Sequence, residues 1–158
     1  MLAFLLALGA ASCSKKQKAD EGAESPAGGV GSSDLAQDMS DSDTGRAAGL
    51  QTVHYAYDSS VLDSTAKGTL DENARILKEK SSLKVQIEGH CDERGGIQYN
   101  IALGERRASV AKAYLVDKGV GADRVTIISY GKEKPVDQGH SEESWAKNRR
   151  SNFRITEK

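Results

Sequence analysis

The chain has 158 residues, of which 37% are hydrophobic and 28% are charged, and its formal net charge is −1. This length suffices for one ordinary domain and a tail, and the composition excludes a polytopic membrane protein and a strongly basic nucleic-acid-binding protein. Aromatic residues make up only 5% of the chain, too few for an extended platform on which single-stranded bases stack. The two cysteines, Cys13 and Cys91, are too few and too isolated for a disulfide scaffold or a zinc site.

The first 12 residues have the pattern of a secretory signal. A short leucine-rich run ends in four small residues and is followed directly by Cys13. The run is shorter than the roughly 20 residues that span a bilayer, so residues 1–12 are interpreted as a signal peptide. A cysteine at this place resembles a bacterial lipoprotein signal and predicts lipidation of Cys13. The alternative is a plain signal peptide with an incidental cysteine.

Residues 13–50 are predicted to form the lipidated N-terminus and a flexible tether. Gly, Ser and Ala supply 18 of the 37 residues between Ser14 and Leu50, and no apolar periodicity is present. Such a segment buries too little apolar surface to offset the entropy that is lost when a chain becomes ordered. Residues 51–158 contain nearly all the remaining hydrophobic residues, and their length is typical of a single domain.

Strands and helices alternate along residues 51–158. The apolar patterns predict strands over 53–57, 83–88, 125–130 and 151–156. A helix is predicted after Asp63, a long helix over 99–118 that ends at Gly119, and a short helical turn through Trp145. This order predicts an α/β sandwich in which helices pack on a mixed four-stranded sheet.

Two charged residues at and near the predicted loop 89–96 indicate a binding site. Arg107 lies on the same face of the long helix as Leu103 and Val110, where an arginine costs desolvation energy unless it is paired. Asp92 lies between a strand and that helix, a place where sites usually form in α/β folds. One fixed anion and one fixed cation suit a zwitterionic ligand, because the acid holds an ammonium and the guanidinium a carboxylate. The alternative for Arg107 is a side chain that snorkels from the edge of the core.

Enzymatic interpretations of the same loop are weaker. Adjacent residues on an extended chain point to opposite sides, so His90 and Cys91 are poorly placed as base and nucleophile. His90, Asp92 and Glu93 carry metal-ligating groups, but no distant partner has a recognisable spacing. We therefore expect no catalytic residue, metal or cofactor, a structural role for His90, and Cys91 as a small apolar filler.

The stretch EGHCDERGGIQYNIALGERRASVAKAYL resembles the core of the OmpA-like peptidoglycan-binding domain family. The stretches DERG, YNIALGERRA, SYGKEKP and KNRR, in this order, resemble the peptidoglycan-associated lipoproteins of that family. The resemblance covers residues 53–155 and implies a βαβαβ core with an added C-terminal strand. It also implies a ligand, the meso-diaminopimelate of the stem peptide in uncrosslinked peptidoglycan.

The resemblance also implies roles for individual residues. Asp92 stands where the family binds the ammonium of diaminopimelate, and Arg107 where it binds the carboxylate. Cys91 departs from the family, which usually has Thr or Ala at that position. The remaining matches either flank or shape the pocket or belong to the scaffold: Tyr57, Asp58, Gly89, His90, Arg94, Gly95, Asn100, Leu103, Asn148 and Arg149.

The resulting prediction is a non-catalytic lipoprotein of the outer membrane whose periplasmic domain binds the cell wall. The resemblance further implies binding to TolB and work with the other Tol proteins in envelope constriction and cell division. Two alternatives stay open: an OmpA-like wall anchor without a Tol partnership, and an enzyme acting on peptidoglycan.

Overall fold

The computed structural model describes residues 40–158, which form a four-stranded sheet and three α-helices. The predicted signal peptide 1–12, Cys13 and the tether residues 14–39 lie outside the described residues. The sheet has the order β1-β4-β2-β3, with β2 and β3 parallel and β4 antiparallel to both β1 and β2. The strands are β1 (Val53–His54), β2 (Lys84–His90), β3 (Val125–Gly131) and β4 (Arg150–Glu157). The predicted mixed α/β architecture is confirmed.

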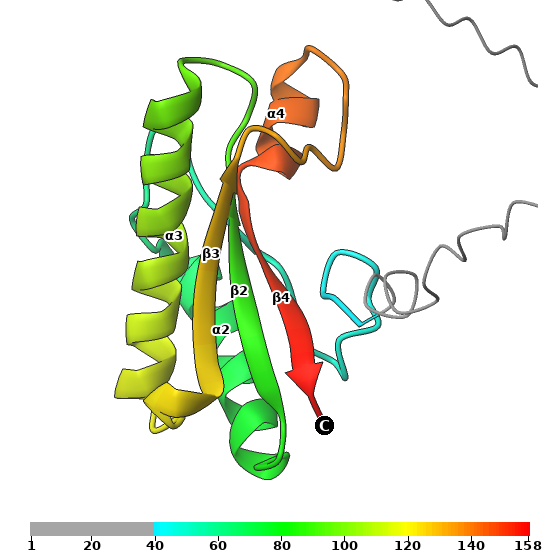
Figure 1. The fold of residues 1–158 in the computed structure, drawn as a ribbon, viewed down its shortest axis with the longest axis vertical. Helices are drawn as coiled ribbons and strands as arrows, with labels where there is room; N and C mark the ends of the chain where they lie inside the picture. Colours follow the sequence, from blue (N-terminus) through cyan, green and yellow to red (C-terminus); the bar gives the residue numbers. More distant parts are fainter. Residues whose placement is uncertain (1–39) are drawn as a thin grey trace, which may run out of the picture. The chain divides into compact units, whose positions relative to one another are not determined.

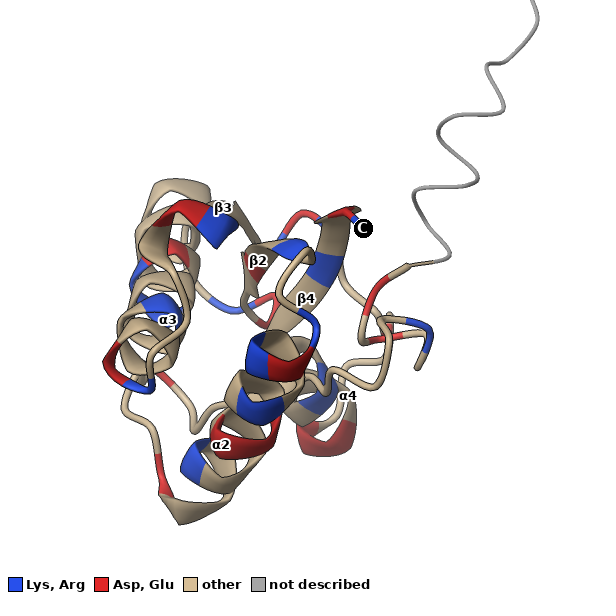
Figure 2. Ribbon diagram, turned by 90° about the horizontal axis from the view of Figure 1, so that it is seen from below, with Lys and Arg blue, Asp and Glu red and all other residues tan. Residues whose placement is uncertain are grey.

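The two long helices, α2 (Ser64–Glu79) and α3 (Ile97–Asp117), cover one face of the sheet (Figure 1). A short helix, α4 (Glu142–Asn148), lies at the end of the sheet where β3 finishes and β4 begins (Figure 1). Within residues 40–158, no helix combines the length and apolar character that a membrane crossing requires. Lys and Arg are interspersed with Asp and Glu along α2 and over this side of the domain, so the side in view carries no single-sign charge (Figure 2).

Local signals set the limits of the helices. The Asp63 carboxylate accepts a hydrogen bond from the Ala66 N–H at 2.7 Å, which caps α2 where the sequence predicted its start. α3 begins two residues before its predicted start and ends beside Gly119, whose φ of +90° suits glycine. The inward faces of both helices pack on the central strands, and Leu70, Leu115 and others there are fully buried.

A glycine pair brings α3 against the backbone of β2. A Cβ atom added to Gly89 of β2 would lie only 1.9 Å from the carbonyl oxygen of Gly104 in α3. Only a residue without a side chain permits this approach. The contact places the first turns of α3 beside the end of β2, which is where the candidate site forms.

Two predicted boundaries near that end are wrong. β1 stops at His54 instead of continuing to residue 57, because the Ala56 carbonyl accepts a hydrogen bond from Arg107 and Asp58 has a φ of +50°. The chain thus leaves the sheet early. The predicted loop at residue 89 begins later, because β2 keeps its pairing with β3 through His90.

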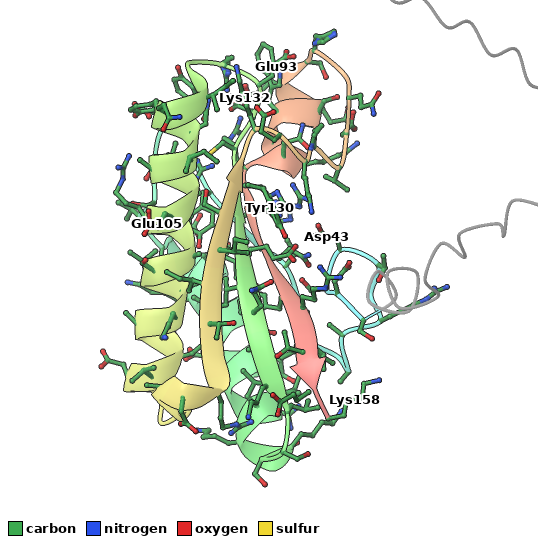
Figure 3. All side chains as sticks on the ribbon, viewed as in Figure 1. Asp43, Glu93, Glu105, Tyr130, Lys132 and Lys158 are labelled. Atoms are coloured by element: carbon green, nitrogen blue, oxygen red, sulfur yellow. The ribbon has the colours of Figure 1, made fainter. Side chains whose placement is uncertain are left out.

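The predicted extension of the tether to residue 50 is also wrong, because residues 40–50 pack on the domain. Ala47 and Leu50 are 0% and 2% exposed and belong to the hydrophobic core. Asp43 forms an ion pair of 2.7 Å with Arg150 at the start of β4, and this segment lies along that strand (Figures 1 and 3). The two apolar residues are too few to produce a periodic pattern, so the sequence did not reveal them.

We expect a domain that begins at residue 51 to be less stable than one that begins at residue 40. Loss of the buried Leu50 side chain alone removes about 1.5–3 kcal/mol of the free energy of unfolding. Urea denaturation followed by circular dichroism measures the difference, and Leu50→Ala in residues 40–158 should fall between the two. Equal midpoints for both fragments would show that residues 40–50 contribute nothing.

Candidate ligand-binding site

A pocket of about 260 Å³ lies between the loop after β2, the start of α3 and the chain after β1. Eight of the predicted site residues line it, including the acid and the arginine that the sequence singled out as a pair. Cys91 and Tyr99, which were not predicted to contact a ligand, complete the lining. The eight are Tyr57, Asp58, Asp92, Arg94, Gly95, Asn100, Leu103 and Arg107.

Arg107 is fully buried, at 0% exposure, and the backbone holds its guanidinium. It donates three hydrogen bonds, to the carbonyl oxygens of Ser59, His90 and Ala56 at 2.8, 2.8 and 3.1 Å. These bonds use three of its five N–H groups. No Asp or Glu of the described residues forms an ion pair with it. Burial lowers the pKa of Arg107, but a guanidinium remains protonated in proteins, so the pocket contains a fixed positive charge.

Asp92 is the buried anion of the pocket, at 4% exposure. Its oxygens accept hydrogen bonds from Nε and Nη2 of Arg94 at 3.1 and 2.7 Å, and from Nη1 of Arg149 at 3.4 Å. Burial on its own raises the pKa of Asp92, but the hydrogen bonds from Arg94 outweigh it and the pKa is lowered. The carboxylate is therefore ionised, and an incoming cation has to share it with Arg94.

Two aromatic rings enclose the guanidinium of Arg94. Its central carbon lies 4.0 Å from the ring centroid of Tyr57 and 4.1 Å from that of Trp145. Trp145 belongs to α4 and also donates from its indole N–H to the Glu93 carboxylate at 2.9 Å. The sequence predicted a helical turn through Trp145 but no role for it at the site, because nothing in the local pattern links it to a loop so far away.

Further hydrogen bonds hold the walls of the pocket. The Tyr99 hydroxyl donates to the carboxylate of Asp58, so two exposed residues from distant segments meet at the mouth. Asn100 donates from Nδ2 to the carbonyl oxygen of Arg94 at 2.8 Å. Gly95 has a φ of +85°, a conformation that favours glycine. Together these features fix the loop over the start of α3.

Three predicted site residues do not line the pocket. Gly89 is the packing position against α3 described above. The His90 imidazole is 2% exposed, and its Nε2 lies 3.8 Å from the Glu88 carboxylate; burial lowers the pKa of His90 more than Glu88 raises it. Arg149 supports the site from behind by bonding Asp92 and the Tyr55 carbonyl, the latter at 3.1 Å.

Asn148, the other residue of the KNRR stretch matched to the family, is also scaffold. Its side-chain oxygen accepts hydrogen bonds from the N–H groups of Val136 and Asp137 at 2.8 and 3.1 Å. These bonds tie the loop before α4 to the end of that helix. Asn148 therefore acts on the site only through the placement of α4.

The model of the OmpA family matches residues 54–149. A peptidoglycan-associated lipoprotein of Pseudomonas aeruginosa is 45% identical over 154 residues, which cover 94% of this chain and 89% of that protein. The crystal structure of the peptidoglycan-associated lipoprotein from Burkholderia pseudomallei is 38% identical, with a TM-score of 0.64 over 66% of this chain and 88% of that chain. The C-terminal domain of Helicobacter pylori MotB, only 19% identical, shares the fold with a TM-score of 0.65 over 70% of this chain and 87% of that chain. The chain therefore belongs to the OmpA family and, within it, to the peptidoglycan-associated lipoproteins.

Proposed function

We propose that the protein binds peptidoglycan non-covalently, and that the pocket receives the meso-diaminopimelate of the stem peptide. The observation that carries the proposal is Arg107, a buried cation held by backbone carbonyls in a pocket that also contains an ionised Asp92. The free end of a diaminopimelate side chain carries one ammonium and one carboxylate, which match these two charges. The names of the relatives, peptidoglycan-associated lipoproteins, support the same ligand.

The two N–H groups of Arg107 that do not bond these three carbonyl oxygens are the donors proposed for the ligand carboxylate. The ligand ammonium would contact the Asp92 carboxylate, which also accepts hydrogen bonds from Arg94. Asp58 supplies a second carboxylate at the mouth of the pocket. The ligand ammonium meets an acid and the ligand carboxylate meets an arginine. A ligand with only one of these two groups therefore loses one contact. Recognition by the pair is therefore more selective than recognition by either charge alone.

We propose that this site binds without catalysis. The Cys91 thiol donates to the Asn100 carbonyl oxygen at 3.3 Å, and burial raises its pKa, so it is not a thiolate nucleophile. His90, its sequence neighbour, does not line the pocket and is not placed to act as a base. An enzyme acting on the wall would release muropeptides from it, and we expect none.

We further propose that lipidation of Cys13 anchors the protein in the outer membrane, with the domain in the periplasm. The support is the sequence before Cys13 and the lipoprotein names of the relatives. Two or more acyl chains hold a protein stably on a bilayer, whereas one holds it marginally. Cells grown with a labelled fatty acid should label the protein, and Cys13→Ser should remove the label. Label that persists on the variant would refute this anchor.

Membership of the family also supports a partnership with TolB and the other Tol proteins in envelope constriction and cell division. The alternative is a wall anchor that works without them. Co-purification from cells with crosslinked envelopes separates the two, because only the first predicts recovery of TolB.

Binding to purified sacculi tests the central proposal. Residues 40–158 should be pulled down, and Asp92→Asn should weaken retention about tenfold or more, because a hydrogen bond to a charged group is worth about 1.5–3 kcal/mol. Asp123→Asn, near the start of β3 and away from the pocket, is the matched control and should bind normally. Retention that is unchanged in Asp92→Asn, with a native circular dichroism spectrum, would refute the assignment.

The Cys91 thiol is expected to be dispensable. Threonine at this position keeps a donor for the Asn100 carbonyl and has nearly the same size, so Cys91→Thr should bind sacculi within about twofold of the parent. Cys91→Val removes the donor and should reduce the free energy of unfolding by about 1 kcal/mol. A large loss of binding in Cys91→Thr would indicate a direct contact between the thiol and the ligand.

A further inference from the structure

We propose that Trp145 of α4 is a positioning residue for the pocket, which holds Arg94 in place over Asp92. The proposal rests on the function proposed above, because it concerns the affinity of the same pocket. Trp145 does not line the pocket itself, so its effect has to pass through the loop that does.

One side chain of α4 holds two consecutive residues of that loop. The Trp145 ring lies against the Arg94 guanidinium at 4.1 Å, and its indole N–H bonds the Glu93 carboxylate at 2.9 Å. The loop is also held by Lys132, whose ammonium donates to the Glu93 and Gly95 carbonyl oxygens at 3.1 and 2.7 Å. Glu93 and Lys132 lie together at the end of the domain that contains α4 (Figure 3).

The residue that follows α4 also contacts the acid directly. Arg149 caps the helix, with its backbone N–H bonded to the Trp145 carbonyl oxygen, and its side chain bonds Asp92 at 3.4 Å. Glu142 at the start of α4 pairs with Arg149 at 2.7 Å and lies 3.7 Å from Arg94. α4 therefore reaches the pocket anion by two routes, through Arg149 and through the stacked Arg94.

The stack restricts a side chain that otherwise has many rotamers. Arg94 is 30% exposed, and without Trp145 it would keep Asp92 and Tyr57 as partners but lose one of the two rings that confine it. A ligand would then have to order Arg94 and its loop on binding, which lowers affinity. Trp145 already restricts Arg94 in the free protein, so less conformational entropy is lost when the ligand binds.

A double-mutant cycle between Trp145 and Arg94 tests the proposal. The dissociation constant of residues 40–158 for a diaminopimelate-containing stem peptide is measured by calorimetry, and thermal unfolding is measured in parallel. Trp145→Ala should bind about three- to tenfold more weakly, as expected for a lost cation–π contact and one freed side chain. Trp145→Phe keeps a ring against Arg94 and should recover most of that loss. In an Arg94→Gln background, Trp145→Ala should have a much smaller further effect, because only the bond to Glu93 is then lost.

The controls separate positioning from general stability. Tyr114→Ala removes another ring that contacts a cation, Lys118, on a part of α3 that does not line the pocket, and it should leave affinity unchanged. The proposal is overturned if Trp145→Ala binds like the parent, if Trp145→Phe loses as much as Trp145→Ala, or if the two losses multiply fully in the double variant. Failure of the parent protein to bind the peptide at all would instead refute the proposed function.

Discussion

Replacement of Arg107 by lysine should reduce binding to sacculi by roughly 10- to 150-fold, the equivalent of about 1.5–3 kcal/mol for a charge-assisted contact. Lysine retains the positive charge but offers three donors on one atom in place of a planar fork of five. It cannot bond three carbonyl groups in different directions and still present two parallel donors to a carboxylate. The measurement is retention on purified sacculi per folded molecule.

Lysine tests binding more directly than alanine does, because alanine at this position would also lower the stability of the domain. Arg107→Ala would leave the carbonyl oxygens of Ala56, Ser59 and His90 without their donor, at about 1–3 kcal/mol for each buried group that stays unsatisfied. Its neighbour Arg106 is exposed, so Arg106→Lys is the matched control and should bind like the parent. Normal retention by a folded Arg107→Lys protein would show that Arg107 does not contact the ligand.

The ligand can be varied in the same experiment. Stem peptides with lysine in place of diaminopimelate lack the carboxylate that Arg107 is proposed to bind, so the parent protein should bind them more weakly. The Arg107→Lys variant should discriminate little between the two peptides, because its contact with that carboxylate is already impaired. If both proteins preferred diaminopimelate to the same extent, the ligand carboxylate would have to bind a residue other than Arg107.

Gly89→Ala is expected to destabilise the domain by about 3 kcal/mol, at the upper end of the usual cost of overpacking. The added methyl group would overlap the Gly104 carbonyl oxygen at 1.9 Å, and neither backbone can withdraw without separating α3 from β2. Thermal or urea unfolding measures the loss. The surviving folded fraction should still bind sacculi, because Gly89 does not line the pocket.

At Gly68, the same glycine-to-alanine substitution is expected to stabilise the domain. It lies inside α2 with no atom within 4 Å of an added Cβ, so Gly68→Ala should stabilise the domain by about 0.5–1 kcal/mol. A Gly89→Ala protein as stable as the parent would mean that α3 can move away from β2. A Gly89→Ala protein that loses binding but keeps its stability would show that Gly89 contributes to ligand binding.

The sequence by itself determined the features that depend on neighbouring residues. The Asp63 cap, the end of α3 at Gly119 and the order of strands and helices all arise from local patterns and were predicted from them. That Asp92 and Arg107 line the same pocket also followed from the sequence, because a helix repeats every 3.6 residues and its start lies beside the preceding loop.

The tertiary structure alone decided the features that join distant segments. The acceptors of Arg107 lie on the chain after β1 and on β2, so its fixed orientation depends on how three segments pack. Trp145 meets Arg94 only because α4 folds over the loop, and Leu50 enters the core only because residues 40–50 return to the sheet. Such contacts gain their free energy from burial and from partners far away in the chain, and no local pattern encodes either.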